Sequence, residues 1–155
     1  MGGMLVALVV VAALLGGGSG LTTERTVGDL KADLSVGKGT YAPGEAVTVR
    51  LRVMNVASSP IVITTYSGQQ SDLIVRQRGA LIWQWSHDKA FAQVVRESTM
   101  APGESLAFAW TWDQRDLQGR HVEPGRYDIS AMFMGSQRSG PRSVEAGPVR
   151  IVIGR

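Results

Sequence analysis

The sequence predicts an all-β protein: an immunoglobulin-like, antiparallel β-sandwich of about eight or nine strands, preceded by an apolar N-terminal segment. Three observations lead to this fold class. Short runs of alternating apolar and polar residues recur from residue 30 onward, turn residues separate them at regular spacing, and no long stretch has a helical period. Such chains are typical of two antiparallel sheets packed face to face. Because the sequence contains no Cys, the likeness to antibody domains is architectural.

The N-terminal residues follow a different pattern. Residues 4–15 are uncharged and almost wholly apolar, and the Gly-rich residues 16–20 come directly after them. This run is shorter than the roughly 20 residues that cross a bilayer, but it suits the core of a signal peptide. We expect a signal peptide or membrane anchor over residues 1–20, a linker over 21–28 and the β-sandwich domain over 29–155. If this segment is a signal, the protein is extracytoplasmic, either secreted or membrane-anchored. If it is not, the protein is cytoplasmic. The alternative is a buried strand or helix of the fold.

Strands are expected wherever apolar residues alternate with polar ones. Arg78-Gly79 separates two of these runs and indicates a hairpin turn. The stretch from Phe91 to Met100 is ambiguous, and we expect a loop or short helix near Phe91 followed by a strand. Pro-Gly occurs three times and marks turns, because Pro presets φ and Gly accepts a positive φ. The expected strands cover residues 30–36, 47–53, 61–66, 73–75, 81–83, 106–112, 127–133 and 149–153.

The four Trp residues fall into two pairs with a spacing of two. Trp83 and Trp85 are expected to share one side of a strand, and Trp110 and Trp112 one side of another. We interpret them as facing walls of one core, in which Trp83 and Trp110 are buried, whereas Trp85 and Trp112 lie at strand ends. The alternative is a sugar-binding platform.

Composition and motifs argue against several classes of function. Sixteen Lys and Arg against 13 acidic residues give a net charge of +3, and the basic residues form no dense stripe, so nucleic-acid binding is not expected. His87 and His121 have no metal-ligand spacing, and we expect neither metal nor cofactor. Ser86, His87 and Asp88 are consecutive and so cannot face one another as a catalytic triad. The protein is therefore not expected to be an enzyme.

A set of short motifs between residues 47 and 133 resembles the BsuPI family of intracellular proteinase inhibitors. In order they read Ser-Gly-Gln-x-x-Asp, Trp-x-Trp-Ser, Phe-x-Gln, Pro-Gly-Glu and Pro-Gly-x-Tyr, and the order is more specific than any one of them. The residues that carry the resemblance are Asn55, Gly68, Asp72, Trp83, Trp85, Phe91, Gln93, Pro102, Gly103, Glu104, Trp110, Gly119, Pro124, Gly125 and Tyr127.

The resemblance implies an immunoglobulin-like β-sandwich that binds a protein partner, a subtilisin-like serine protease, through a surface loop. The motif residues are mostly structural. Asp72 and Glu104 are expected to fix turns through backbone N–H groups, and Gly68 and Gly103 to supply special backbone angles. The alternative function is an exported protein-interaction module at the cell surface with no protease target.

Two loops are candidates for the contact with a protease, 113–123 and 135–147. In the first, Arg115, Leu117 and Arg120 are the candidate interaction residues, since Leu117 is an apolar residue in a polar loop. The alternative for Leu117 is packing within the hairpin. Binding to membrane is expected only through the N-terminal segment, if it is not cleaved.

Overall fold

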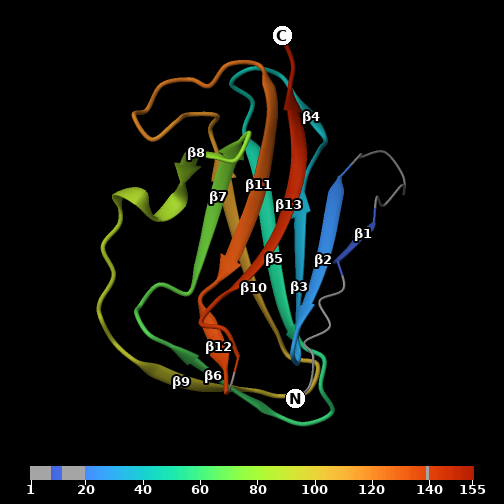
Figure 1. Ribbon diagram of the computed structural model, residues 1–155, viewed down its shortest axis with the longest axis vertical. Coiled ribbons are helices and arrows are strands. Elements are labelled where there is room, and N and C mark those ends of the chain that lie inside the picture. The colour runs from blue at the N-terminus through green and yellow to red at the C-terminus, as the bar shows by residue number, and fades with distance from the viewer. Residues whose placement is uncertain (1–7, 12–19, 139) are drawn as a thin grey trace.

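The protein is all-β in the computed structural model, which describes residues 8–11, 20–138 and 140–155. Its strands form three sheets (Figure 1). The order in the first is β1 (Leu8–Val11), β2 (Leu21–Val27), β3 (Leu30–Val36), β5 (Val47–Asn55) and β10 (Ser105–Trp112). The order in the second is β4 (Thr40–Tyr41), β13 (Val144–Ile153), β11 (Gly125–Phe133), β7 (Ser71–Gln77) and β8 (Ala80–Gln84). The third has β12 (Gly135–Gln137), β6 (Ile61–Thr65) and β9 (Arg96–Met100).

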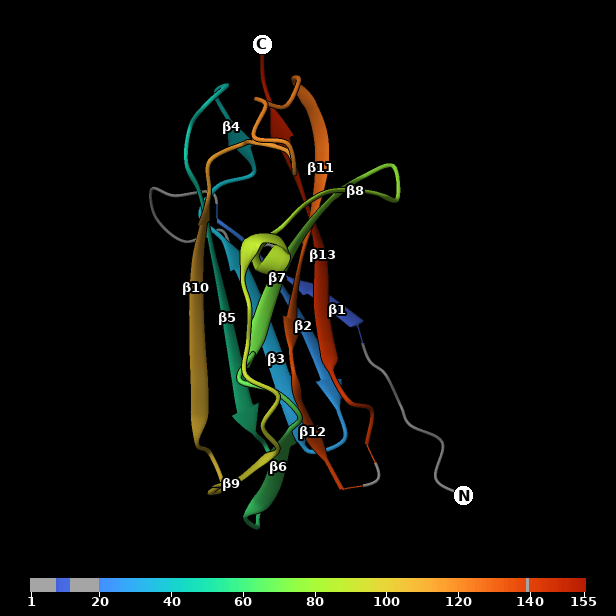
Figure 2. The same cartoon turned by 90° about the vertical axis from the view of Figure 1, so that its left-hand side faces the viewer.

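The first two sheets lie face to face and enclose the core, as the turned view in Figure 2 shows. Strands β3 and β5 alternate strictly between buried and solvent-facing positions over most of their length. This alternation follows from the period of two in their sequences, because successive side chains of a strand point to opposite faces. Among the described pairs, every ladder is antiparallel except that between β13 and the short β4. The predicted sandwich of antiparallel sheets is thus consistent with the structure.

The linker expected over residues 21–28 is wrong. Residues Leu21–Val27 form β2, which pairs with the whole of β3 from Leu21 opposite Val36 to Val27 opposite Leu30. Thr23 and Val27 are buried, each at 2% exposure. The segment showed no strand pattern because only its ends are apolar. Within the expected signal or anchor, residues 8–11 form β1 beside β2, and residues 1–7 and 12–19 lie outside the described ones.

The described chain has thirteen strands, against the eight or nine expected. The additional ones are mostly short, such as the two-residue β4 and the three-residue β12, and such lengths leave no periodic signal in a sequence. The strand expected at residues 73–75 is longer and spans β7. In the region from 91 to 100, β9 follows a loop as expected, and a helical turn, η1 (Trp85–Asp88), lies just upstream of this region.

Two Ala-Pro-Gly-Glu segments, 42–45 and 101–104, form the same turn. The Gly in each has φ +78°, an angle that a residue with a Cβ rarely adopts. A carboxylate oxygen of Glu104 accepts a hydrogen bond from the Ala101 N–H at 2.7 Å, and Glu45 does the same for Ala42 at 2.9 Å. Glu104 was expected to fix this turn through a backbone N–H group, and the group that donates to it is that of Ala101.

Candidate functional site

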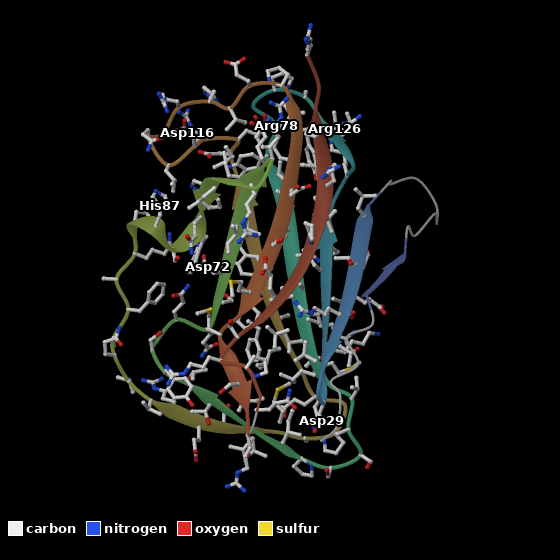
Figure 3. The ribbon with its side chains drawn as sticks, viewed as in Figure 1. Asp29, Asp72, Arg78, His87, Asp116 and Arg126 are labelled. Carbon is white, nitrogen blue, oxygen red and sulfur yellow. The ribbon has the colours of Figure 1, made fainter. Side chains whose placement is uncertain are left out.

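Three segments lie along one side of the sandwich, two of them beside β8 and the third running from η1 toward β9. They are η1, the segment 89–95 that follows it and the loop 113–123, and we call these elements together with β8 the β8 side (Figure 1). Figure 3 places His87 of η1 and Asp116 of the loop on this side. A backbone hydrogen bond joins the loop to the strand, because the N–H of Leu117 donates to the carbonyl of Ile82 at 3.0 Å.

The tip of loop 113–123 is closed by its own hydrogen bonds. One carboxylate oxygen of Asp116 accepts the backbone N–H groups of Gln118 at 2.9 Å and Arg120 at 3.0 Å. The other lies 3.1 Å from the Arg120 guanidinium. The hydrogen bond from the backbone of Arg120 is the main cause that holds the pKa of Asp116 below its ordinary value. The exposed residues 118–120 therefore project from a turn with a defined shape.

The base of the same loop is attached to the core. The indole N–H of the fully buried Trp112 donates to the carbonyl of Arg115 at 2.9 Å. Gln114 is also buried, and its side chain bonds the backbone of the turn at residues 42–45 three times. Gln114 has φ +60°, a left-handed backbone angle that is uncommon for a residue other than Gly. Gln114 was not predicted from the sequence, because a Gln at the start of a polar loop gives no signal of burial.

The three candidate interaction residues of this loop lie in different surroundings. Arg115 and Arg120 are exposed, and Arg115 donates to the Gly119 carbonyl at 2.8 Å and lies 3.3 Å from Asp113. Leu117 is half-buried where the loop meets β8. The loop thus presents two guanidinium groups and one partly covered apolar side chain.

The segment 89–95 has no regular secondary structure and is mostly exposed. Its middle is held by the Gly68 N–H, which donates to the Ala92 carbonyl at 2.8 Å, and by Phe91, whose ring centroid lies 6.1 Å from that of Trp85. Val94 and Val95 are 38% and 65% exposed. This segment was not among the loops predicted to contact a protease. The other predicted contact loop, 135–147, includes β12 and the start of β13.

A buried carboxylate fixes the start of η1. Asp72, at 3% exposure, accepts four hydrogen bonds: from the backbone N–H groups of Leu73 and Ser86, at 3.0 and 3.1 Å, and from the side chains of Gln84 and Ser86, at 2.7 and 2.6 Å. Asp72 was expected to fix a turn through backbone N–H groups, and the groups that donate to it are those of Leu73 and Ser86. This network joins β7 to the point where β8 turns into η1.

Residues 34–138 match the model of a protein family described as BsuPI, the intracellular proteinase inhibitors. The match covers more than half of the 155-residue chain. The chain belongs to the BsuPI family. The resemblance seen in its short motifs is thereby confirmed, and the family is described as proteinase inhibitors.

The extracytoplasmic location expected from residues 1–20 is wrong, because the BsuPI family is described as intracellular. That expectation depended on the apolar run at 4–15, most of which lies outside the described residues. Within the described ranges, no helix has both the length and the apolar character needed to cross a membrane.

Several solved structures are similar to parts of this chain, at low identity. An alkylpurine DNA glycosylase from Pseudomonas fluorescens aligns over 82% of this chain and 31% of its own, with 14% identity and a TM-score of 0.47. The sporulation control protein Spo0M from Bacillus subtilis aligns over 83% and 50%, with 18% identity and a TM-score of 0.45. This chain therefore spans half or less of these proteins. None of the curated proteins matches it.

Two further BsuPI motif residues, Asn55 and Tyr127, are buried and form hydrogen bonds within the sandwich. The side chain of the fully buried Asn55 donates to the carbonyls of Ser59 and Met100, both at 3.0 Å, and accepts the Ala57 N–H at 2.9 Å. The buried Tyr127 donates its hydroxyl to the Glu123 carbonyl, beside Pro124 and Gly125. Gly119 has φ +79° at the tip of loop 113–123, while Gly68 shows no positive φ and Gln93 is exposed.

The aromatic residues divide differently from the prediction. Trp110 is buried as expected, at 6% exposure, and Trp112 is fully buried. Trp83, expected to be buried, is only half-buried, because β8 is the edge strand of its sheet. Its ring centroid lies 6.1 Å from that of His87. Trp85 lies in η1 rather than on the strand. With all four rings buried or half-buried, the Trp residues form no exposed sugar-binding platform.

Replacing Asp72 with Ala is expected to lower the free energy of unfolding by about 2–3 kcal/mol. Four donors would lose their acceptor, and the Leu73 N–H would be left in a buried position. Urea unfolding measures the effect. Gln69→Ala is a suitable control, because its side chain makes a single bond, to the Ser71 carbonyl, in the neighbouring turn. Equal stability of the two variants would contradict this role of Asp72.

Proposed function

We propose that this protein is a proteinase inhibitor that binds a subtilisin-like serine protease through the β8 side, with loop 113–123 as the main contact. Membership of the BsuPI family is the observation that carries the proposal, because the family is described by this activity. The protein acts by occupying the protease rather than by catalysis. The partner's identity as a subtilisin-like enzyme is what the family resemblance implies, and it is part of the proposal.

The shape of loop 113–123 supports its role as the inhibitory contact. A loop held in its bound conformation before association loses less entropy on binding, and this raises affinity. Asp116 closes the tip, Gln114 and Trp112 fix the base, and the Leu117 N–H holds the flank to β8. A tip fixed at so many points also resists the local unfolding that cleavage by a protease requires.

The segment 89–95 lies on the same side and is proposed as a secondary contact. It exposes Val94 and Val95, whose side chains bury apolar surface when a partner covers them. Its attachment is weaker, since the Ala92 carbonyl and the Phe91 ring carry most of it. Loop 113–123, which many hydrogen bonds hold in place, would set the orientation of the bound protease. The segment 89–95, which fewer contacts hold, would add buried apolar area.

Inhibition of a purified subtilisin by the full chain tests this function. In one variant, Asn-Gly replaces residues 116–120 between Arg115 and His121, which form an isolated antiparallel bridge and so accept a two-residue turn. We expect inhibition to weaken by about tenfold or more, because the tip residues are lost while Trp112 and Gln114 keep their bonds. The matched control is Val62→Ser, an exposed position on β6 in the third sheet.

Two outcomes would contradict the proposal. One is the absence of inhibition by the full chain at micromolar concentration. The other is rapid cleavage within 116–120, seen by mass spectrometry, because the chain would then be a substrate. If the Asn-Gly variant inhibits as strongly as the full chain, loop 113–123 is not the main contact. Val95→Asp then tests whether the segment 89–95 is that contact.

A further inference from the structure

Strand β10 is the open edge of the first sheet. Among the described residues it pairs only with β5, through eight positions from Ser105 opposite Met54 to Trp112 opposite Val47. In Figure 2 it stands at one margin of the molecule, and no described segment lies outside it. Within the part of the chain that the structure describes, no segment covers its free side.

The register determines which backbone groups point to that free side. The Asn55 N–H donates to the Glu104 carbonyl at 3.0 Å, so these two residues form a hydrogen-bonded pair at the end of the ladder. Hydrogen-bonded and non-hydrogen-bonded pairs alternate along an antiparallel ladder. The N–H and C=O groups that point away from β5 therefore belong to Ser105, Ala107, Ala109 and Thr111. None of these backbone groups bonds to another described segment.

This edge lacks the features that usually protect an edge strand. Natural proteins cover or shorten such strands, or place charges and Pro on them. The sequence of β10, Ser-Leu-Ala-Phe-Ala-Trp-Thr-Trp, has eight residues and neither a charge nor Pro. Its exposed positions carry small side chains, Ala107, Ala109 and Thr111. In contrast, β4 at an edge of the second sheet has two residues, and the Ile82 carbonyl of β8 is bonded to Leu117.

The outer face beside the edge carries two Arg residues of β5, Arg50 and Arg52, with one acidic residue, Asp33, opposite Arg52 on the far side of β5. Arg52 lies opposite Ala107 in the register and Arg50 opposite Ala109, and both are exposed. The Arg52 guanidinium also donates to the Ser105 hydroxyl at 3.1 Å, which places it close to β10. These residues line a shallow groove of about 480 Å³. Because the intervening Ala residues are small, the guanidinium groups are accessible to acidic side chains on a strand added at the edge.

The inner face beside the edge is apolar. Leu106 and Phe108 point inward from β10 and are only half-buried. An added strand would place every second side chain next to them, because its residues share the pleat of the sheet. The edge therefore favours a strand in which apolar and acidic residues alternate.

We propose that β10 binds an extended segment of a partner protein, with alternating apolar and acidic residues, as an additional antiparallel strand. The outward N–H and C=O groups of β10 pair with the backbone of the segment. Its acidic side chains face Arg50 and Arg52, and its apolar side chains cover Leu106 and Phe108. Strand addition of this kind takes affinity from the main chain and specificity from alternate side chains. The proposal is independent of proteinase inhibition, since it uses the edge of the other sheet.

The probe is a synthetic eight-residue peptide of alternating Val and Glu, with both ends blocked, and its matched control replaces Glu with Lys. Binding is followed by fluorescence anisotropy of labelled peptide with the full chain. We expect saturable binding of the Glu peptide and at least about tenfold weaker binding of the Lys peptide. Arg50→Gln combined with Arg52→Gln should reduce this preference. Hydrogen exchange should show new protection at Ala107, Ala109 and Thr111.

Two further comparisons separate strand addition from general attraction. Ala109→Pro removes an outward N–H, which an edge strand tolerates, and should weaken binding about tenfold, whereas Ala109→Val keeps the N–H and should not. On the peptide side, residues opposite Ala107 and Ala109 carry the acidic side chains and turn their N–H groups toward β10. N-methylation of the Glu residues should therefore abolish binding, while N-methylation of the Val residues should not.

Three results would overturn the proposal. The first is no saturable binding of the Glu peptide. The second is equal loss of binding for the two N-methylated peptides. The third is a dimer of the chain in analytical ultracentrifugation that Ala109→Pro dissociates, because the occupant of β10 would then be a second copy.

Discussion

Replacing Trp112 with Ala is expected to lower the free energy of unfolding by about 3–5 kcal/mol, the range for a large aromatic in a packed core. The Trp112 side chain is fully buried, its ring centroid lies 5.7 Å from that of Tyr127, and its indole N–H bonds the Arg115 carbonyl. The variant therefore leaves a cavity and an unpaired carbonyl at the base of loop 113–123. Urea unfolding followed by far-UV circular dichroism measures the change.

Trp83→Ala is the matched control, because Trp83 is an aromatic of the same size that is only half-buried. We expect it to cost about half as much, since the transfer free energy scales with the apolar area removed from water. The same comparison distinguishes two views of the Trp pairs. Equal costs would mean that Trp83 contributes to the core as fully as the sequence predicted. A cost for Trp112→Ala below about 1 kcal/mol would contradict its place in the core.

The fold could be predicted from the sequence wherever burial alternates along a strand. In β5, residues 47–53 show the alternation directly, since every apolar residue is buried and every second position is polar. In β2 the pattern fails, because a buried Thr23 looks like a surface residue and no apolar residue stands between Leu21 and Val27. β2 forms because it pairs with β3 and packs against β13 of the other sheet. The sequence pattern of one strand carries no information about such neighbours.

The contacts at the β8 side depend on details of register that the sequence does not specify. An ideal two-residue hairpin at Arg78-Gly79 would place Trp85 opposite Asp72. A bulge between Val75 and Arg76 shifts the pairing by one residue, so that Ile74 faces Gln84 and the backbone of Ser86 reaches Asp72. The motif positions were therefore recognisable, while the bonds among them were not. The same holds for Gln114, whose partners at residues 42–45 are distant in sequence.

A chain that begins at Asp29, and so lacks β2, is expected to lose about 5 kcal/mol or more, which is comparable to the whole stability of a domain of this size. Seven residue pairs join β2 to β3. Arg25 donates to the Glu145 carbonyl of β13 at 2.8 Å, so that β2 also connects the two sheets. Without it, the buried Leu30 and Leu34 of β3 lie at a new open edge.

A chain that begins at Gly20 is the matched control, because it loses β1 but keeps β2 paired with β3 and in contact with β13 of the other sheet. We expect this chain to unfold cooperatively in urea and the chain from Asp29 to show no cooperative transition. Equal midpoints for the two would support a domain over 29–155 and make β2 dispensable. We expect the chain from Asp29 to lose its cooperative transition, because a sandwich is stable only while both of its sheets cover the shared core and β2 carries the buried Val27 into that core.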